Sequence, residues 1–258
     1  MAAGIDADPN RLGGLEWVRR THGKLTRRER ARLLAAIARG QWENVVGRTK
    51  LMFGSVPPGA ADVDLDAFAV PDTRFAREAE EACAELPQGW IGHSYRTWLF
   101  GNALAVVDGT PLDRELFYCG ALLHDYGIIN PTPGEDFTAR SAERTSAAAV
   151  AAGADPQRAH QLADAICVHT TPGATIERDG PLGTYLQWGA MVDGAGLRSW
   201  DITSEVRSEV VRRYPRDGFK AELIAAVRAE ATAVPGGRFD LLRRCGMTLA
   251  VRAAPFPS

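Results

Sequence analysis

Residues 121–127 read Ala-Leu-Leu-His-Asp-Tyr-Gly and predict the end of a buried helix that carries a histidine and an aspartate. The residues before His124 are apolar, and Gly127 is placed to end the helix. An imidazole and a carboxylate cost free energy in such an interior unless each has a partner. A divalent metal ion is the simplest partner for both, because neutral His nitrogen and ionised Asp oxygen bind Zn, Fe and Mn. His124 and Asp125 are therefore candidate metal ligands.

The overall composition is that of a globular protein. The chain has 258 residues, of which 45% are apolar and 24% charged, which predicts one large or two small domains. A formal net charge of -2 gives no general attraction to nucleic acid or to anionic membranes. We find neither an apolar run long enough to span a membrane nor the basic and apolar regions of a signal peptide. We therefore expect a soluble, cytoplasmic protein that binds neither nucleic acid nor membrane.

The four cysteines do not form a metal-binding pattern. They lie far apart in the sequence and include no CxxC pair, at Cys83, Cys119, Cys167 and Cys245. This spacing argues against a zinc ribbon and is typical of reduced thiols in a protein core.

The N-terminal part contains one predicted helix and a long loop. Thr26-Arg-Arg-Glu29 is a capping box, and it predicts a helix that runs through about Ala38. Residues 54–71 hold three prolines, two glycines and three aspartates, so we expect a loop or linker there. We therefore divide the chain into an N-terminal extension and linker, residues 1–71, and a main domain, residues 72–258.

The main domain has the pattern of successive helices. Thr110-Pro-Leu-Asp113 is a second capping box, with proline at the first helical position, so the helix that carries His124 should begin near Pro111. We expect helices over about 75–86, 91–107, 111–124, 139–152, 156–169, 182–192, 203–214 and 219–231. No segment alternates as a strand would. The predicted fold class is all-α, a helical bundle with an N-terminal helical extension.

His93 and Asp193 occupy similar settings on two other predicted helices. His93 shares its helix with the apolar side chains of Trp98 and Leu104. Asp193 follows Ala-Met-Val at the end of another apolar segment. Three helices thus each deliver a His or an Asp from an apolar setting. Two histidines and two carboxylates leave room for water on a five- or six-coordinate metal.

The order of these motifs resembles the HD superfamily of metal-dependent hydrolases. The resemblance rests on His93, on Leu-Leu-His-Asp-Tyr-Gly at 122–127 and on Met-Val-Asp-Gly-Ala at 191–195. It covers roughly residues 72–220 and implies an HD-type helical bundle. It also implies one catalytic divalent metal ion at His93, His124, Asp125 and Asp193, with Zn as the first choice and Fe or Mn as the others.

Four further motifs are similar to the cyanamide-hydratase-like branch of this superfamily. They are Gly-His-Ser-Tyr-Arg-Thr-Trp at 92–98, Phe137 ahead of an Ala-rich helix, Ala-Ile-Cys-Val-His at 165–169 and Tyr-Pro-Arg-Asp-Gly-Phe at 214–219. Relatives of this branch often have an acidic residue directly after the phenylalanine, where this chain has Thr138. That departure leaves the substrate open.

A second departure concerns the number of metal ions. Superfamily members with two metals carry two more histidines between the His-Asp pair and the last aspartate. Residues 139–149 contain no histidine, and only the second of the two is matched, by His169. We therefore expect one metal and no di-iron oxygenase chemistry.

The spacing of His160 and His169 predicts that only one of the two imidazoles faces the candidate metal site. Nine residues at about 100° each place the two imidazoles on opposite faces of one helix. His169 stands in the position that the resemblance assigns to the site, so we expect it to lie behind the ligands or to face the substrate. The alternative is a capping or core histidine. We expect His160 at the surface.

A bound divalent ion suggests a mechanism. Such an ion lowers the pKa of a ligated water from about 16 toward about 7. Asp125 could serve as ligand and as proton acceptor. Arg96 lies one turn after His93, so it could neutralise an anionic substrate or could pair with a buried carboxylate as scaffold. Arg140 and Arg144 share one helix face; a phosphoryl substrate gains support if they line the pocket and loses it if they are solvated.

Three function classes remain open, besides a His-Asp pair that merely satisfies itself by hydrogen bonding. The first is a hydrolase that attacks a phosphoester or related bond in a small polar molecule. The second is a hydratase that adds water to a cyanamide- or nitrile-type carbon, favoured by a small, aromatic-lined pocket. Candidate lining residues are Tyr95, Trp98, Phe137 and Trp188. The third is a non-catalytic, metal-stabilised binding or regulatory module.

We expect a small-molecule substrate, with Asp125, His169 and Arg96 as catalytic residues. The apolar content leaves room for a homodimer, although no heptad pattern is evident that would fix one.

Overall fold

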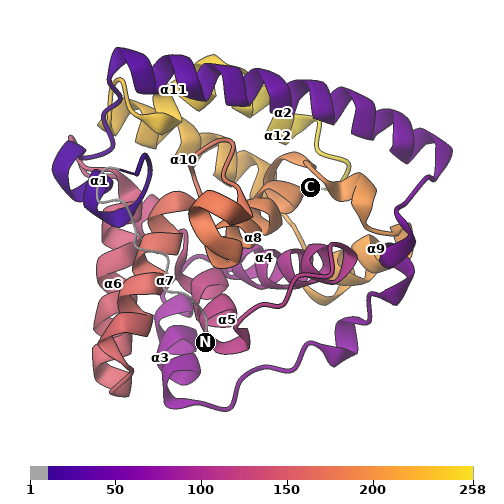
Figure 1. The fold of residues 1–258 in the computed structure, drawn as a ribbon, viewed down its shortest axis with the longest axis horizontal. Coiled ribbons are helices and arrows are strands. Elements are labelled where there is room, and N and C mark those ends of the chain that lie inside the picture. The colour runs from indigo at the N-terminus through magenta and orange to yellow at the C-terminus, as the bar shows by residue number, and fades with distance from the viewer. Residues whose placement is uncertain (1–10, 258) are drawn as a thin grey trace.

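The computed structural model describes residues 11–257, which form twelve α-helices and four short 3-10 helices with no β-strand (Figure 1). The all-α prediction is confirmed. In chain order the α-helices are α1 (Leu15–Thr21), α2 (Arg27–Phe53), α3 (Arg74–Cys83), α4 (Gln88–Val107), α5 (Arg114–Leu123), α6 (Phe137–Ala152), α7 (Pro156–Val168), α8 (Ile176–Ala195), α9 (Ser204–Arg213), α10 (Phe219–Ala233), α11 (Arg238–Arg244) and α12 (Met247–Arg252). The 3-10 helices are η1 (Pro58–Asp62), η2 (Leu65–Ala67), η3 (Tyr126–Ile128) and η4 (Ser199–Asp201).

The pair formed by α4 and α8 lies at the centre of the molecule (Figure 1). Glycines allow the two helices to approach closely. A Cβ atom at Gly189 would lie 2.4 Å from the Thr97 carbonyl oxygen, and one at Gly101 would lie 2.9 Å from the Tyr185 carbonyl oxygen. Any larger residue at either position would push α4 and α8 apart. This contact holds His93 of α4 near the residues of α8.

α5 is buried from Leu116 onward and ends at the candidate site. Its side chains from Leu116 to Leu123 are all buried, with α3, α4, α6, α7 and α8 around them. The Asp113 side chain accepts a hydrogen bond from the Leu116 N–H (2.9 Å) and so caps the helix. The predicted start near Pro111 is therefore wrong, because Asp113 is the N-cap residue and not part of the first turn.

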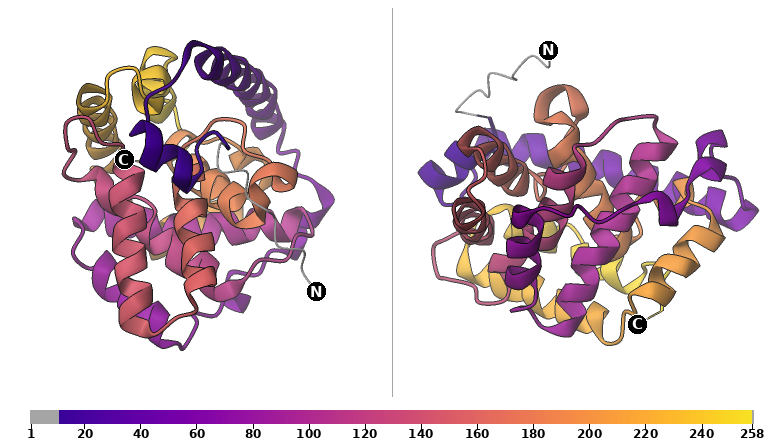
Figure 2. Two further views of the ribbon diagram at one scale, coloured as in Figure 1. Left: turned by 60° about the vertical axis from the view of Figure 1, so that its left-hand side comes forward. Right: turned by 90° about the horizontal axis from the view of Figure 1, so that it is seen from below.

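The helix predicted to end near Ala38 continues to Phe53 as α2. Its capping box is confirmed, since the Thr26 and Glu29 side chains each bond the other residue's backbone N–H. α2 runs along one edge of the molecule, in front of α11 and α12 (Figures 1 and 2). The prediction stopped too early because the apolar residues after Ala38 do not continue the buried face begun by Leu33.

Three short helices were not predicted, and α8, like α2, is longer than predicted. α1, α11 and α12 have only six or seven residues each, too few to give a clear helical period. α8 begins at Ile176, before the predicted start at Leu182, and is kinked at Gly180, where φ is 72° and Pro181 follows. The segment predicted as a loop, residues 54–71, contains η1 and η2. The division of the chain at residue 71 stays a prediction.

A buried ion pair joins the C-terminal helices to the rest of the fold. The Arg238 guanidinium donates to both Asp136 carboxylate oxygens at 2.9–3.3 Å and to the Cys167 carbonyl oxygen at 2.6 Å. It also lies over the Trp17 ring, 5.3 Å from the ring centre. One side chain of α11 thus contacts α1, the start of α6 and the end of α7. Loss of either partner would leave a buried charge uncompensated.

The cysteines are free thiols that lie mostly in the core. All four cysteines are free, and Cys83, Cys119 and Cys167 are buried. Burial raises the pKa of the Cys83 thiol to about 11, so that thiol is uncharged at neutral pH. Within residues 11–257 no helix has both the length and the apolar character needed to cross a membrane.

Glu230 gives the fold a measurable pH dependence. Burial and the nearby Asp136 carboxylate raise the pKa of Glu230 from 4.5 to about 7. The folded state therefore keeps a proton that the unfolded state loses near pH 4.5, and stability falls as the pH rises from about 4.5 to about 7. We expect Glu230→Gln to remove up to about 3 kcal/mol of this fall. Urea unfolding at pH 5 to 8 measures it, with exposed Glu16→Gln as control; equal slopes in wild type and Glu230→Gln would contradict it.

Candidate metal centre

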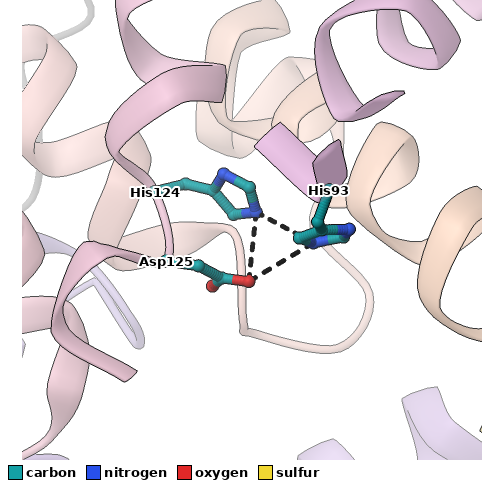
Figure 3. A group of neighbouring side chains, drawn as sticks. All are labelled: His93, His124 and Asp125. Carbon is teal, nitrogen blue, oxygen red and sulfur yellow. Dashed lines mark hydrogen bonds and ion pairs between the residues drawn. The ribbon is translucent and has the colours of Figure 1, made fainter. Parts of the chain in front are cut away.

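Two helix segments bring His93, His124 and Asp125 together in the interior (Figure 3). His93 projects from the second turn of α4, His124 is the C-cap residue of α5, and Asp125 follows it. The His93 and His124 Nε2 atoms are 3.3 Å apart, and each lies 3.3 Å from Asp125 Oδ2. All three side chains are buried. The convergence of these three residues, predicted from sequence, is therefore found in the structure.

The other ring nitrogen of each histidine already has an acceptor. His124 Nδ1 lies 2.9 Å from the Ala121 carbonyl oxygen, and His93 Nδ1 lies 2.7 Å from Asp193 Oδ2. A neutral imidazole carries one N–H, which these acceptors place on Nδ1. Both Nε2 lone pairs then point at each other and at the Asp125 carboxylate. Lone pairs and an anion in contact require a cation between them, so the donor set fits a divalent metal ion.

His169 approaches the same carboxylate from the opposite side. It is the C-cap residue of α7, its Nδ1 bonds the Ile166 carbonyl oxygen, and its Nε2 lies 3.3 Å from Asp125 Oδ1. The Gln187 side chain of α8 donates to the His169 carbonyl oxygen at 2.8 Å and so fixes this turn. His160, on the other face of α7, is exposed. Of the two histidines, His169 is the one that faces Asp125.

The pKa values of Asp125 and His124 favour their metal-binding forms, whereas that of His93 favours its protonated form. Burial raises the pKa of Asp125, but His124, His169 and His93 lower it well below its usual value, so the side chain is a carboxylate. Burial lowers the pKa of His124, which is neutral at pH 7. Burial also lowers the pKa of His93, but hydrogen bonds to Asp125 and Asp193 raise it above its usual value. A cation at His93 Nε2 would take the place of that proton.

Asp193 lies behind His93, away from the other two side chains. Its Oδ2 accepts from His93 Nδ1, and its Oδ1 accepts from Arg96 Nε at 2.8 Å and from Arg216 Nη1. Carboxylates in this position fix the orientation of a metal-binding histidine. The two guanidinium charges overcome the effect of burial and hold the pKa of Asp193 far below its usual range. Its predicted role as a direct ligand stays a prediction.

Residues 90–188 match the HD domain. This segment is an HD domain. None of the curated proteins matches the chain. The match contains His93, His124, Asp125 and His169, and it ends before Asp193. It shows the superfamily resemblance for this segment, while the cyanamide-hydratase-like branch stays a prediction.

Arg96 of the HD domain is fully buried and engaged by protein groups. Besides Asp193, it donates from Nη1 to the Tyr214 and Pro215 carbonyl oxygens at 3.1 and 2.8 Å. Of the two roles considered for Arg96, contact with substrate and pairing with a buried carboxylate, the structure shows the pairing. Its catalytic role stays a prediction.

Arg216 is a residue of the site that the sequence interpretation did not assign. It lies after the HD domain, is buried, and donates from Nη1 to the Asp193 side chain and to the Asp193 carbonyl oxygen. Arg96 and Arg216 both lie over the Phe219 ring, at 5.0 and 5.4 Å, and His93 stacks on the same ring at 4.8 Å. The signal was present in the Tyr-Pro-Arg-Asp-Gly-Phe motif, where an arginine stands among turn residues.

The other predicted arginines do not reach the cluster. Arg140 donates to the Gly127 carbonyl oxygen at 2.6 Å, and Arg144 donates to Glu85 Oε1 at 2.7 Å and lies over the Tyr126 ring. Neither side chain contacts His93, His124 or Asp125. Both arginines stabilise the turn that follows the His-Asp pair.

The four candidate aromatic residues are dispersed around the HD domain. Phe137 is edge-on to His169 at 6.1 Å and is the member of this group that contacts a histidine of the site. Trp98 packs on Tyr118, and Trp188 packs on Tyr185 under Arg198. Tyr95 stacks on Tyr214 and lines a cavity of about 470 Å³ that borders Gly92 and includes none of the cluster residues. Trp90 and Phe219, which were not predicted, contact the His93 ring.

Removal of the Asp193 charge tests this network. We expect Asp193→Asn to destabilise the fold by about 3–5 kcal/mol, because two buried guanidinium groups lose their counter-ion. It should also weaken metal binding by about 10–100-fold through the loss of His93 orientation. Urea unfolding and chelator competition measure the two effects. Asp72→Asn, which breaks an exposed pair with Arg77, is the matched control and should change neither quantity measurably. Equal effects of the two substitutions would contradict the network.

Proposed function

We propose that the chain is a metal-dependent phosphohydrolase of the HD type that uses one divalent ion. His93, His124 and Asp125 would hold the ion. The observation that carries the proposal is the set of two Nε2 lone pairs and one carboxylate converging in the interior of an HD domain. When bound, such an ion lowers the pKa of a coordinated water toward about 7 and so supplies hydroxide at neutral pH. Zn remains the first choice of ion, with Fe and Mn as the others.

The number of donors supports catalysis over a purely structural role. A closed structural zinc site has four protein ligands, whereas a catalytic site keeps a position for water. His93, His124 and Asp125 supply three donors, and Asp193 is turned toward Arg96 and Arg216. A fourth position would therefore remain for water. A non-catalytic, metal-stabilised module is the alternative, and it would bind metal without turnover.

The charge balance around the cluster supports an anionic substrate. Arg96 and Arg216 carry two positive charges, and Asp125 and Asp193 carry two negative charges, so these buried groups cancel. The full charge of a divalent ion would then be uncompensated by these residues. A phosphoester oxygen would be attracted to it more strongly than a neutral nitrile.

A cyanamide- or nitrile-type hydratase with the same metal site is the second candidate. It is favoured by the pairing of Arg96, Arg140 and Arg144 with protein groups, which leaves none of the three at the cluster. It is also favoured by the aromatic rings of Phe219 and Phe137 against the histidines. In either reaction His169, whose Nε2 faces Asp125 Oδ1, would take up and return a proton. We propose a small polar molecule as substrate and the cytoplasm as compartment.

Elemental analysis of the purified protein tests the metal site. We expect about one equivalent of Zn, Fe or Mn in the wild type, and its loss in the His124→Ala, Asp125→Ala double variant. A His22→Ala, His160→Ala double variant removes two histidines outside the cluster and should keep the metal. The loaded protein is then assayed with phosphoesters and with nitriles. No retained metal would contradict the site, and metal without turnover would favour the non-catalytic module.

The role of His169 has a separate test. We expect His169→Ala to lower kcat by about 100- to 10,000-fold, as for loss of a proton-transfer group, while the metal content stays near that of the wild type. His160→Ala, on the opposite face of α7, is the matched control and should leave kcat unchanged. If the metal content of His169→Ala fell together with its activity, His169 would be a ligand instead.

A further inference from the structure

The outward face of α2 carries large apolar side chains that nothing within residues 11–257 covers. Trp42, Met52 and Phe53 are 69%, 83% and 79% exposed, and Val45 and Val46 are also exposed. These five residues, called here the α2 stripe, are related by steps of three, four and seven positions and so share one side of the helix. Soluble monomers rarely expose a continuous apolar patch of this kind.

The opposite face of α2 is held to the body of the protein largely by polar contacts. Gln41 donates to the Cys245 carbonyl oxygen at 2.7 Å, and Arg48 donates to the Ala253 carbonyl oxygen at 2.9 Å. Gly47 lies against the Trp200 ring so closely that a Cβ atom there would be 2.0 Å from it. These contacts fix the rotation of α2 about its axis. The α2 stripe therefore cannot turn inward and remains available for another surface.

The spacing along α2 is that of a helix pairing seam. Residues at alternating intervals of three and four occupy the outer face, at Ala35, Ala38, Trp42, Val45, Thr49 and Met52, and all six are exposed. This is a heptad pattern, which the sequence interpretation missed because it ended the helix near Ala38. α2 has 27 residues and is about 40 Å long, enough for a helix partner to lie along it.

We propose that a second copy of this chain covers the α2 stripe, with the two α2 helices antiparallel about a two-fold axis near residue 47. The charges beside the stripe select this partner. Glu43 and Lys50 lie on one flank, and neither forms an ion pair with another described residue. In an antiparallel pair each Glu43 lies level with the partner's Lys50, whereas a parallel pair would set like charges level. Trp42 then lies level with Met52 and Phe53 of the other copy.

The area is of the right order for a dimer. Aromatic side chains can each bury about 150–250 Å², so Trp42, Phe53 and the three aliphatic residues together offer on the order of 500 Å² per copy. A standard interface buries about 800 Å² per partner, which the stripe and its flanks approach. The proposal does not depend on the metal centre.

Sedimentation velocity of the full chain is the first test. We expect a species of twice the 27.9 kDa chain mass at micromolar concentration. Trp42→Glu should raise the dimer dissociation constant at least about 30-fold, as for a buried aromatic anchor. Val150→Glu, which places the same charge at an 80% exposed valine of α6, is the matched control and should leave the dimer intact. A wild-type monomer, or a dimer that survives Trp42→Glu, would overturn the proposal.

Charge exchange and cross-linking test the direction of pairing. Glu43→Lys and Lys50→Glu should each weaken the dimer, and the double exchange should restore it. Val46→Cys lies near the axis and should cross-link to its own copy under oxidation. Met52→Cys should not, because the two copies would be about 15 Å apart along the helix. Cross-linking of Met52→Cys but not Val46→Cys would overturn the antiparallel arrangement, and so would a double exchange that fails to restore the dimer. Circular dichroism confirms that each variant is folded.

Discussion

The buried carboxylate of Asp125 is the constraint on which the centre of the molecule depends. Three imidazole Nε2 atoms surround it, from His93, His124 and His169, and each has its Nδ1 committed to another acceptor. Such an arrangement is stable in an apolar interior only with a cation or a shared proton among the nitrogens. Two features of the fold bring these residues together around the carboxylate. The helices end where His124 and His169 stand, and glycines let α4 and α8 approach closely.

A second group of buried charges supports the first from behind. Arg96 and Arg216 hold Asp193, Asp193 holds His93 Nδ1, and the Phe219 ring lies under all three cationic or imidazole groups. The ring excludes water, so the interactions among these charges are screened less than they would be at the surface. The orientation of His93 is thus set by residues from α4, α8 and the turn before α10. The geometry of the cluster therefore depends on this support as much as on His93, His124 and Asp125 themselves.

The sequence allowed the central part of the fold and the core of the site to be predicted, because both depend on local signals. The capping box at Thr26, the apolar helix ending at His124 and the apolar setting of His93 are readable without tertiary contacts. The C-terminal half of α2 was missed because the helix was predicted from apolar residues that recur on the buried face. The apolar residues of this half face outward instead. Arg216 was missed because a lone arginine in a turn gives no periodic signal. The Tyr-Pro-Arg-Asp-Gly-Phe motif contained it, but its role follows from the contact with Asp193.

The contact between His93 and Asp193 joins residues 100 positions apart in the chain. Closing so long a loop costs entropy, which the packing of α4 on α8 helps to offset. During synthesis the support for His93 is incomplete until Arg216 has left the ribosome. A nascent chain therefore presents His93, His124 and Asp125 without the groups that orient them. At the proposed metal site, the ion would bind about 10–100-fold more weakly until these groups are in place, so tight binding would report that the chain has folded past α9.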